Sequence, residues 1–127
     1  MSKKLILSIN NLSFGYTKER DVLKDMNLNL DEGKILGILG ASGIGKSSLL
    51  RIIVGLEVPK TGEVLYEEKF LSKKDFFVPP QKRGIGLVVQ EKALFPHLNV
   101  LENVKFGLQG TRRKKDDQAM KFLKLLQ

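Results

Sequence analysis

Residues 40–47 are the segment of this sequence that most restricts its fold. They read Gly-Ala-Ser-Gly-Ile-Gly-Lys-Ser and match the pattern G-x-x-x-x-G-K-[ST] at every position. This pattern is typical of a loop between a buried strand and a helix. The preceding residues 35–39 are apolar and partly β-branched, which predicts a buried parallel strand. The following residues 46–54 have the spacing of an amphipathic helix that ends at Gly55.

The composition of the loop predicts that it binds the phosphates of a nucleotide. Its glycines permit backbone conformations in which successive N–H groups curve around an anion, and the helix N-terminus adds its positive dipole end. Lys46 would reach the β- and γ-phosphates, and the Ser47 hydroxyl would bind Mg²⁺. A glycine-rich turn that matches by chance is the alternative, and the flanking strand and helix argue against it. The expected binding set is Gly40, Ser42, Gly43, Ile44, Gly45, Lys46, Ser47 and Ser48.

The chain as a whole has the composition of a globular protein. Its 127 residues suffice for one core of ordinary domain size. No apolar run approaches the roughly eighteen residues of a membrane helix, and the N-terminus lacks the pattern of a signal peptide. There is no cysteine, which excludes disulfides and thiolate metal sites. We expect a cytoplasmic location.

Half of the net charge of +8 lies in residues 111–127, where six Lys and Arg side chains stand against two Asp. The basic cluster 112–115 could contact phosphates or anionic lipid. A solvated helix face is the favoured interpretation, because neither stacking aromatic residues nor a nucleic-acid motif accompanies it. No nucleic-acid partner is expected.

The remaining periodicity predicts further strands and helices. Residues 5–14 and 22–30 indicate an antiparallel pair, and residues 63–66 a short strand. A second apolar run, 84–89, predicts a parallel strand that ends at Gln90, where polar side chains tend to face a ligand crevice. Helices are expected over 100–106 and from about Thr111, the latter with an apolar stripe of Ala119, Phe122, Leu123 and Leu126.

Residues 88–104 closely resemble the Q-loop region of ATP-binding-cassette (ABC) transport ATPases. Gly55-Leu56 and residues 61–64 stand at matching distances from the phosphate loop, and the similarity covers nearly all of residues 3–127. The resemblance implies an α/β fold, a P-loop NTPase (RecA-like) core with an N-terminal antiparallel β subdomain and the start of a helical subdomain. The expected regions of this one domain are 1–34 and 60–83 (mainly antiparallel β), 35–55 (strand, phosphate loop and helix), 84–92 (Q-loop strand and loop) and 93–127 (start of the helical subdomain).

The resemblance also implies roles for residues outside the phosphate loop. Tyr16 looks like the aromatic residue that stacks on adenine; packing of a strand-end aromatic on its neighbours is the alternative. Gln90 resembles the glutamine that reaches Mg²⁺ and the attacking water, and a solvated glutamine is the alternative. Together with Lys46 it forms the expected catalytic set. The region Gln90–Val104 resembles the surface on which membrane permease subunits dock, and His97 within it is interpreted as a packing or interface residue.

Other features of the family are missing. After Gln90 there is no L-S-G-G-Q signature, no apolar strand ending in Asp-Glu and no later switch histidine. The chain thus resembles only the N-terminal half of the domain, and we expect a truncated piece that binds ATP and Mg²⁺ but does not hydrolyse ATP alone. In the family's sheet, strands from the other half separate 35–39 from 85–89. The two runs would therefore lie on either side of a position in the sheet that no strand of this chain fills. We expect this to leave the chain poorly stable, self-associated or rearranged.

The function that the resemblance implies is that of the ATP-binding subunit of an ABC importer. Such a subunit is a homodimer, peripheral on the inner face of the cell membrane, and it meets a solute-binding protein indirectly through the permease. Residues 78–83 look like the branch that serves iron, oxyanions, polyamines or sugars, and ferric iron or another inorganic ion is the candidate solute. The alternatives are a non-catalytic nucleotide-binding or regulatory fragment and an ABC protein that acts on nucleic acid.

Overall fold

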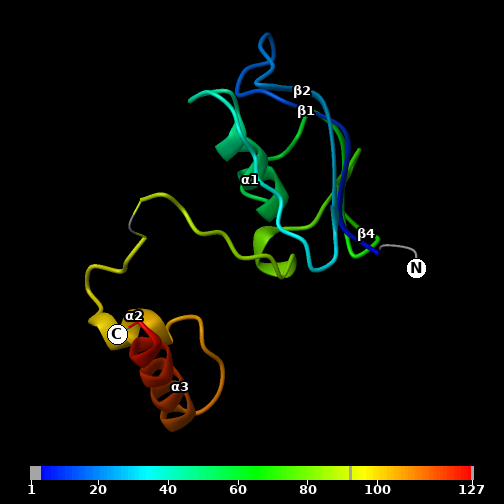
Figure 1. Ribbon diagram of the computed structural model, residues 1–127. Helices are drawn as coiled ribbons and strands as arrows, with labels where there is room; N and C mark the ends of the chain where they lie inside the picture. Colours follow the sequence, from blue (N-terminus) through cyan, green and yellow to red (C-terminus); the bar gives the residue numbers. More distant parts are fainter. Residues whose placement is uncertain (1–3, 92, 127) are drawn as a thin grey trace. The chain divides into compact units, whose positions relative to one another are not determined.

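A computed structural model describes residues 4–91 and 93–126, so the expected region boundaries at residues 1, 92 and 127 lie outside the described part. The chain divides into two compact units, unit 1 (Met1–Leu87) and unit 2 (Val88–Gln127). Unit 1 holds the strands, one α-helix and a short 3₁₀ helix (Figure 1): β1 (Leu5–Phe14), β2 (Leu23–Asp31), α1 (Lys46–Val54), β3 (Thr61–Tyr66), β4 (Lys69–Lys73), β5 (Phe76–Phe77) and η1 (Pro80–Lys82). Unit 2 holds α2 (Val100–Lys105) and α3 (Arg112–Leu125).

The strands of unit 1 form one antiparallel sheet in the order β2-β1-β3-β4-β5. β1 pairs with β2 on one side, with Ile9 opposite Leu28, and with β3 on the other, with Ile9 opposite Val64. The β1–β3 register shifts between Asn10 and Ser13, and there Gly62 (φ +91°) approaches β1 so closely that a Cβ would lie 2.5 Å from the Leu12 Cα. The predicted antiparallel pair and the strand over 63–66 are confirmed.

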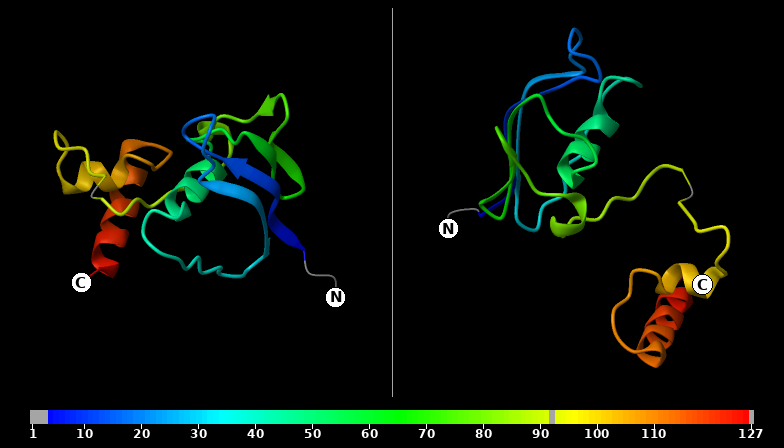
Figure 2. Two further views of the ribbon diagram at one scale, coloured as in Figure 1. Left: turned by 90° about the horizontal axis from the view of Figure 1, so that it is seen from above. Right: turned by 180° about the vertical axis from the view of Figure 1, so that it is seen from behind.

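α1 covers one face of this sheet and completes the core of unit 1 (Figures 1 and 2). Its residues Leu49, Ile52 and Ile53 follow the i, i+3, i+4 spacing that brings side chains onto one helix face, and all three are buried. They pack with the inward-facing residues of the sheet, which are Leu7, Ile9, Leu12, Phe14, Leu23, Val64 and Leu71. The helix ends at Gly55 in the left-handed conformation, as predicted.

The two apolar runs predicted as parallel strands, 35–39 and 84–89, are not strands in the structure. Ile35 is 100% and Leu39 96% exposed, and Val88 is as open as Leu39. A parallel strand is stable only between neighbours that complete its hydrogen bonds and cover both of its faces. The strand pairings among the described residues are all antiparallel, and neither run takes part in them. The prediction of buried strands at these two positions was therefore wrong for this structure.

Unit 2 is held together mainly by polar contacts and by two contacts between aromatic rings, Phe95 with Phe106 and Phe95 with His97. The N-terminus of α2 carries a capping box in which the Asn99 side chain accepts from the Glu102 N–H and the Glu102 carboxylate accepts from the Asn99 N–H. Phe95 packs on Phe106 with ring centroids 4.2 Å apart, and Lys105 Nζ lies 2.6 Å from Asp116 Oδ1. The helices predicted over 100–106 and from Thr111 are confirmed within a residue.

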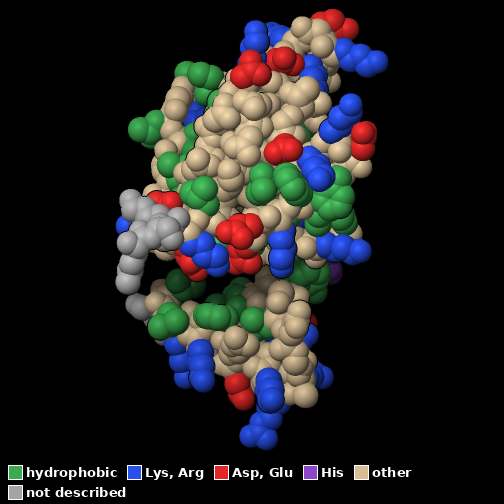
Figure 3. Space-filling view, turned by 90° about the vertical axis from the view of Figure 1, so that its right-hand side faces the viewer, with side chains coloured by type: hydrophobic (Ala, Val, Ile, Leu, Met, Phe, Trp, Pro, Cys, Tyr) green, Lys and Arg blue, Asp and Glu red, His purple; other side chains and the backbone are tan. Residues whose placement is uncertain are grey.

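The apolar stripe predicted for α3 is only partly covered. Ala119 is buried, whereas Phe122 and Leu126 are exposed. Arg112, Arg113 and Lys114 are exposed and Lys115 is half-buried, and Figure 3 shows blue Lys and Arg side chains in the lower part of the picture. The predicted solvated basic face is consistent with this exposure of residues 112–114.

Candidate nucleotide site

Glycines of the phosphate loop in unit 1 adopt the backbone conformations that the sequence pattern predicts. Gly43 and Gly45 adopt φ values of +79° and +113°, which favour residues without a Cβ. A Cβ on Gly45 would also lie 2.8 Å from Leu23 Cδ2 and 2.9 Å from Val22 Cγ1, so this glycine lets the start of α1 rest on the start of β2. Gly43 and Gly45 thus let the backbone of the loop curve, and Gly45 also lets the loop pack closely against the sheet.

The Lys46 side chain bends back across the loop. Its Nζ donates to the carbonyl oxygens of Gly40, at 2.6 Å, and of Ala41, at 2.7 Å. The ammonium group therefore lies at the loop that leads into α1, and the N-terminus of this helix adds the positive end of its dipole. Ser47, the next residue, is exposed. The residues present therefore fit a polyphosphate ligand, with the lysine already directed at the loop that would enclose it.

Tyr16 lies beside the phosphate loop. Its hydroxyl and the Oγ of Ser48 are 3.0 Å apart, which joins the segment just after β1 to the first turn of α1. Its ring packs edge-on against Phe14, with centroids 5.0 Å apart, yet the residue remains 64% exposed. The structure thus brings Tyr16 to the loop. One shallow hollow is lined by residues of both segments, namely Tyr16, Thr17, Arg20, Asp21, Val22, Gly43 and Ile44.

Gln90 belongs to unit 2 and is exposed, whereas the loop belongs to unit 1. Its role at Mg²⁺ therefore remains a prediction. Within the described residues, 4–91 and 93–126, no three His, Asp or Glu side chains gather in a way that could hold a metal ion. The ligands expected from the sequence are instead the neutral oxygens of Ser47 and Gln90. Such a set fits Mg²⁺, which is commonly bound through substrate phosphates and few protein groups.

Arg83 is a structural residue at the opposite end of α1 from this site, and sequence reasoning missed it. Its side chain is 3% exposed and donates to the carbonyl oxygens of Ile52 and Ile53 at the C-terminal end of α1. Burial lowers the pKa of Arg83, because leaving water disfavours the charged form. Its neighbours Gln81 and Lys82 are exposed and polar, so no local periodicity marks position 83 as interior.

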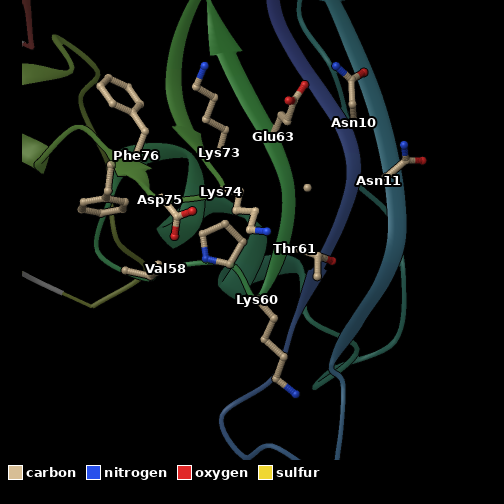
Figure 4. Close-up of a pocket in the computed structure, with 13 residues that line it drawn as sticks. Asn10, Asn11, Val58, Lys60, Thr61, Glu63, Lys73, Lys74, Asp75 and Phe76 are labelled. Atoms are coloured by element: carbon tan, nitrogen blue, oxygen red, sulfur yellow. The ribbon is translucent and has the colours of Figure 1, made fainter.

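A second hollow of unit 1 lies away from the phosphate loop (Figure 4). It is formed by the turn between β4 and β5, with Lys73, Lys74, Asp75 and Phe76, and by Asn10 and Asn11 on β1, with residues 58–63 between them. The described residues that line it include none of the predicted nucleotide-binding set. The phosphate-binding features therefore gather at the loop and not in this hollow.

The fold and the loop together are those of part of a P-loop domain of the ABC ATPase type. Residues 23–127 match the family model described as ABC transporter, so the chain belongs to the ABC transporter family. It is 41% identical over 122 residues to the Fe(3+) ions import ATP-binding protein FbpC of Haemophilus influenzae (strain 86-028NP), covering 96% of this chain and 34% of the relative. It is 44% identical over 124 residues to the spermidine/putrescine import ATP-binding protein PotA of Spiroplasma citri, covering 95% and 34%. The chain thus spans about a third of the length of these curated relatives.

Solved structures of the same type superpose on this fold. The ATP-binding cassette MJ0796, described as a dimer in a post-hydrolysis state bound to ADP and Pi, matches with a TM-score of 0.76 and 31% identity, covering 94% of this chain and 56% of that one. The cbiO1 protein of Clostridium perfringens, part of the transporter complex cbiONQ, matches with a TM-score of 0.76 and 27% identity, covering 96% and 50%. Among the described residues of the present chain, no helix has the length and apolar character needed to cross a membrane.

Proposed function

We propose that this chain carries the Mg·ATP-binding part of the ATP-binding subunit of an ABC import system. The observation that carries the proposal is the phosphate loop at the start of α1, with Lys46 Nζ held by the Gly40 and Ala41 carbonyls. These two carbonyls hold the ammonium group of Lys46 at the loop. When ATP binds, its β- and γ-phosphates would take the place of the carbonyls as partners of the ammonium group. The loop N–H groups would bind the same phosphates, and Ser47 would supply an oxygen to Mg²⁺.

The adenine end of the nucleotide would lie on Tyr16. Its ring is largely exposed, and its hydroxyl is fixed by Ser48 in the first turn of the helix that begins at the phosphate loop. An aromatic face held in this way provides a stacking surface for a base. In the same proposal, Gln90 meets Mg²⁺ and the attacking water.

In the complete importer, the region Gln90–Val104 would dock on membrane permease subunits. The exposed Phe95 and Phe106 rings and the adjacent His97, whose ring centroid lies 6.0 Å from that of Phe95, supply an apolar surface for such a contact. The subunit would act as a homodimer on the inner face of the membrane and meet the solute-binding protein only through the permease. Ferric iron or another inorganic ion is the first candidate solute, supported by the name of the Haemophilus influenzae relative. The polyamine relative makes spermidine the competing candidate in an uptake assay.

A second candidate is a nucleotide-binding or regulatory protein without hydrolytic activity. Residues 91–127 contain neither an L-S-G-G-Q signature nor an apolar strand ending in Asp-Glu, so these residues supply no carboxylate pair that would activate water. Both candidates share ATP binding. They differ in turnover, and we expect the 127-residue chain alone to hydrolyse ATP no faster than background. A steady-state rate comparable to that of a complete ABC ATPase would reject this expectation.

Lys46→Ala tests the shared step. It removes the charge that would contact the β- and γ-phosphates, so we expect calorimetric titration with Mg·ATP to detect no binding. Lys34→Ala is the matched control, since it removes another exposed lysine close to the loop in sequence, and its ATP affinity should equal that of the unmodified chain. Unchanged affinity in Lys46→Ala would refute the role assigned to this lysine.

Co-purification with nucleic acid instead of permease subunits would favour the ABC proteins that act on nucleic acid.

A further inference from the structure

Arg83 is a charged side chain in the interior of unit 1. Burial of a guanidinium group is unfavourable unless its donors find partners. Here Nε donates to the Val78 carbonyl at 2.7 Å, and one terminal nitrogen donates to Ile52 and Ile53 at 2.9 and 3.0 Å. The other terminal nitrogen donates to the Leu71 carbonyl at 3.3 Å. All four acceptors are backbone oxygens, so Arg83 connects segments of the main chain.

The segments that Arg83 connects are the last turn of α1, strand β4 and the residue after β5. Carbonyl groups in the last turn of a helix lack intrahelical donors, and a positive charge is favourable there. The guanidinium also lies over the Phe77 ring, 4.7 Å from its centroid. Gly55 makes room for it, since a Cβ at this position would lie 2.5 Å from the Arg83 Nε. The hydrogen bonds of this one side chain thereby add a directional connection between the C-terminal end of α1 and the sheet to the apolar contacts of Ile52 and Ile53.

The other end of the same helix carries the phosphate loop. There Gly45 rests against Leu23, and Ser48 is bonded to Tyr16. A helix of nine residues is about 14 Å long and moves as a stiff rod, so a shift at one end is transmitted to the other. Without Arg83, α1 would keep its apolar contacts with the sheet but lose the directional bonds that set its tilt.

We propose that Arg83 is a positioning residue of the nucleotide site, which fixes α1 at its C-terminal end and thereby sets the phosphate loop relative to Tyr16. This inference rests on the proposed ATP-binding function. Lysine cannot replace arginine here, because a single ammonium lacks the planar fork that reaches carbonyls on three segments. The effect of substitution should therefore appear at the loop, at the other end of α1, and not only at the bonds that are removed.

The test compares Arg83→Gln and Arg83→Lys with the unmodified chain and with Lys82→Gln, a control at the exposed neighbouring position on η1. Hydrogen exchange is followed at the Leu49 amide, which donates to the Gly45 carbonyl at the loop end of α1, and at the amides of β1 and β3. Affinity is measured for Mg·ATP and for adenosine, which lacks phosphates. If Arg83→Gln does not fold, Arg83→Lys carries the same comparison.

We expect Leu49 exchange to be about tenfold faster in the Arg83 variants, with β1 and β3 unchanged, and ATP affinity to fall about tenfold while adenosine affinity stays within about twofold. The Lys82→Gln control should match the unmodified chain. Unchanged Leu49 exchange would overturn the positioning role. Uniformly faster exchange with equal loss of ATP and adenosine affinity would also overturn it, since Arg83 would then support only general stability. Failure of the unmodified chain to bind ATP would instead reject the proposed function itself.

Discussion

Units 1 and 2 of this protein are stabilised in different ways. In unit 1, apolar residues from four strands and α1 gather in one buried cluster. In unit 2, Ala119 is the only buried residue among those described. The fold of unit 2 depends instead on hydrogen bonds between side chains and the backbone. Asn103 alone donates to the carbonyls of Phe95, Leu98 and Asn99 and accepts from the Phe95 N–H.

The difference indicates which substitutions each unit can tolerate. Removal of buried carbon from a packed core costs both the transfer free energy and the cavity left behind. A unit with little buried carbon has less to lose in this way, and its stability depends on the geometry of a few polar groups. Free energies of unfolding and exchange rates in the two units should therefore respond to different residues.

The largest effect is expected for Ile52→Ala. Ile52 is fully buried between α1 and the sheet, so its truncation should lower the free energy of unfolding by about 2–5 kcal/mol in urea titrations. Leu50→Ala on the exposed face of the same helix is the control and should change it by less than about 1 kcal/mol. Ile52→Val, expected to cost about 0.5–1.5 kcal/mol, keeps the comparison measurable if the alanine variant does not fold. Equal losses at positions 50 and 52 would contradict the core assignment.

An intermediate and local effect is expected for Asn103→Ala in unit 2. The change removes the acceptor of the Phe95 N–H and the donors to three carbonyls. Hydrogen exchange at the Phe95 amide should become about tenfold faster, which corresponds to roughly 1.4 kcal/mol, while amides of β1 keep their protection. Gln109→Ala, at an exposed position of the same unit, should leave Phe95 exchange unchanged. If unit 2 were held by apolar packing instead, both variants would behave alike.

The smallest effect on stability is expected for Ile35→Ser. Ile35 belongs to unit 1 but lies outside its core with its side chain fully exposed, so the free energy of unfolding should change by less than about 0.5 kcal/mol. The same change should shift size-exclusion elution toward the monomer if the exposed apolar run promotes self-association. Ile9→Ser in the core is the contrasting control and should be strongly destabilising. A loss above 1 kcal/mol for Ile35→Ser would show that the run is packed in solution.

Much of unit 1 could be predicted from local sequence patterns. The bounds of α1 and its end at Gly55, the antiparallel pairing of β1 with β2, and the glycines with left-handed φ in the phosphate loop all follow from short-range patterns. In unit 2, the capping box at Asn99 also follows from a recognisable short-range spacing, with Glu102 three residues after the cap. The apolar composition of residues 35–39 and 84–89 predicted parallel strands that the structure does not contain. Composition was insufficient here because a strand forms only with neighbouring strands, which composition does not reveal.

The sequence by itself determined the chemistry of the candidate site: a phosphate loop with Lys46 and Ser47 next to a helix start, in a chain of the ABC transporter family. Only the tertiary structure decided that Tyr16 meets Ser48, that Arg83 is buried against the end of α1, and that two apolar runs remain exposed. The physical reason is the distance along the sequence over which each effect acts. Glycine conformation and helix periodicity act over a few residues, whereas burial and hydrogen bonding of Arg83 depend on carbonyls up to 31 positions away.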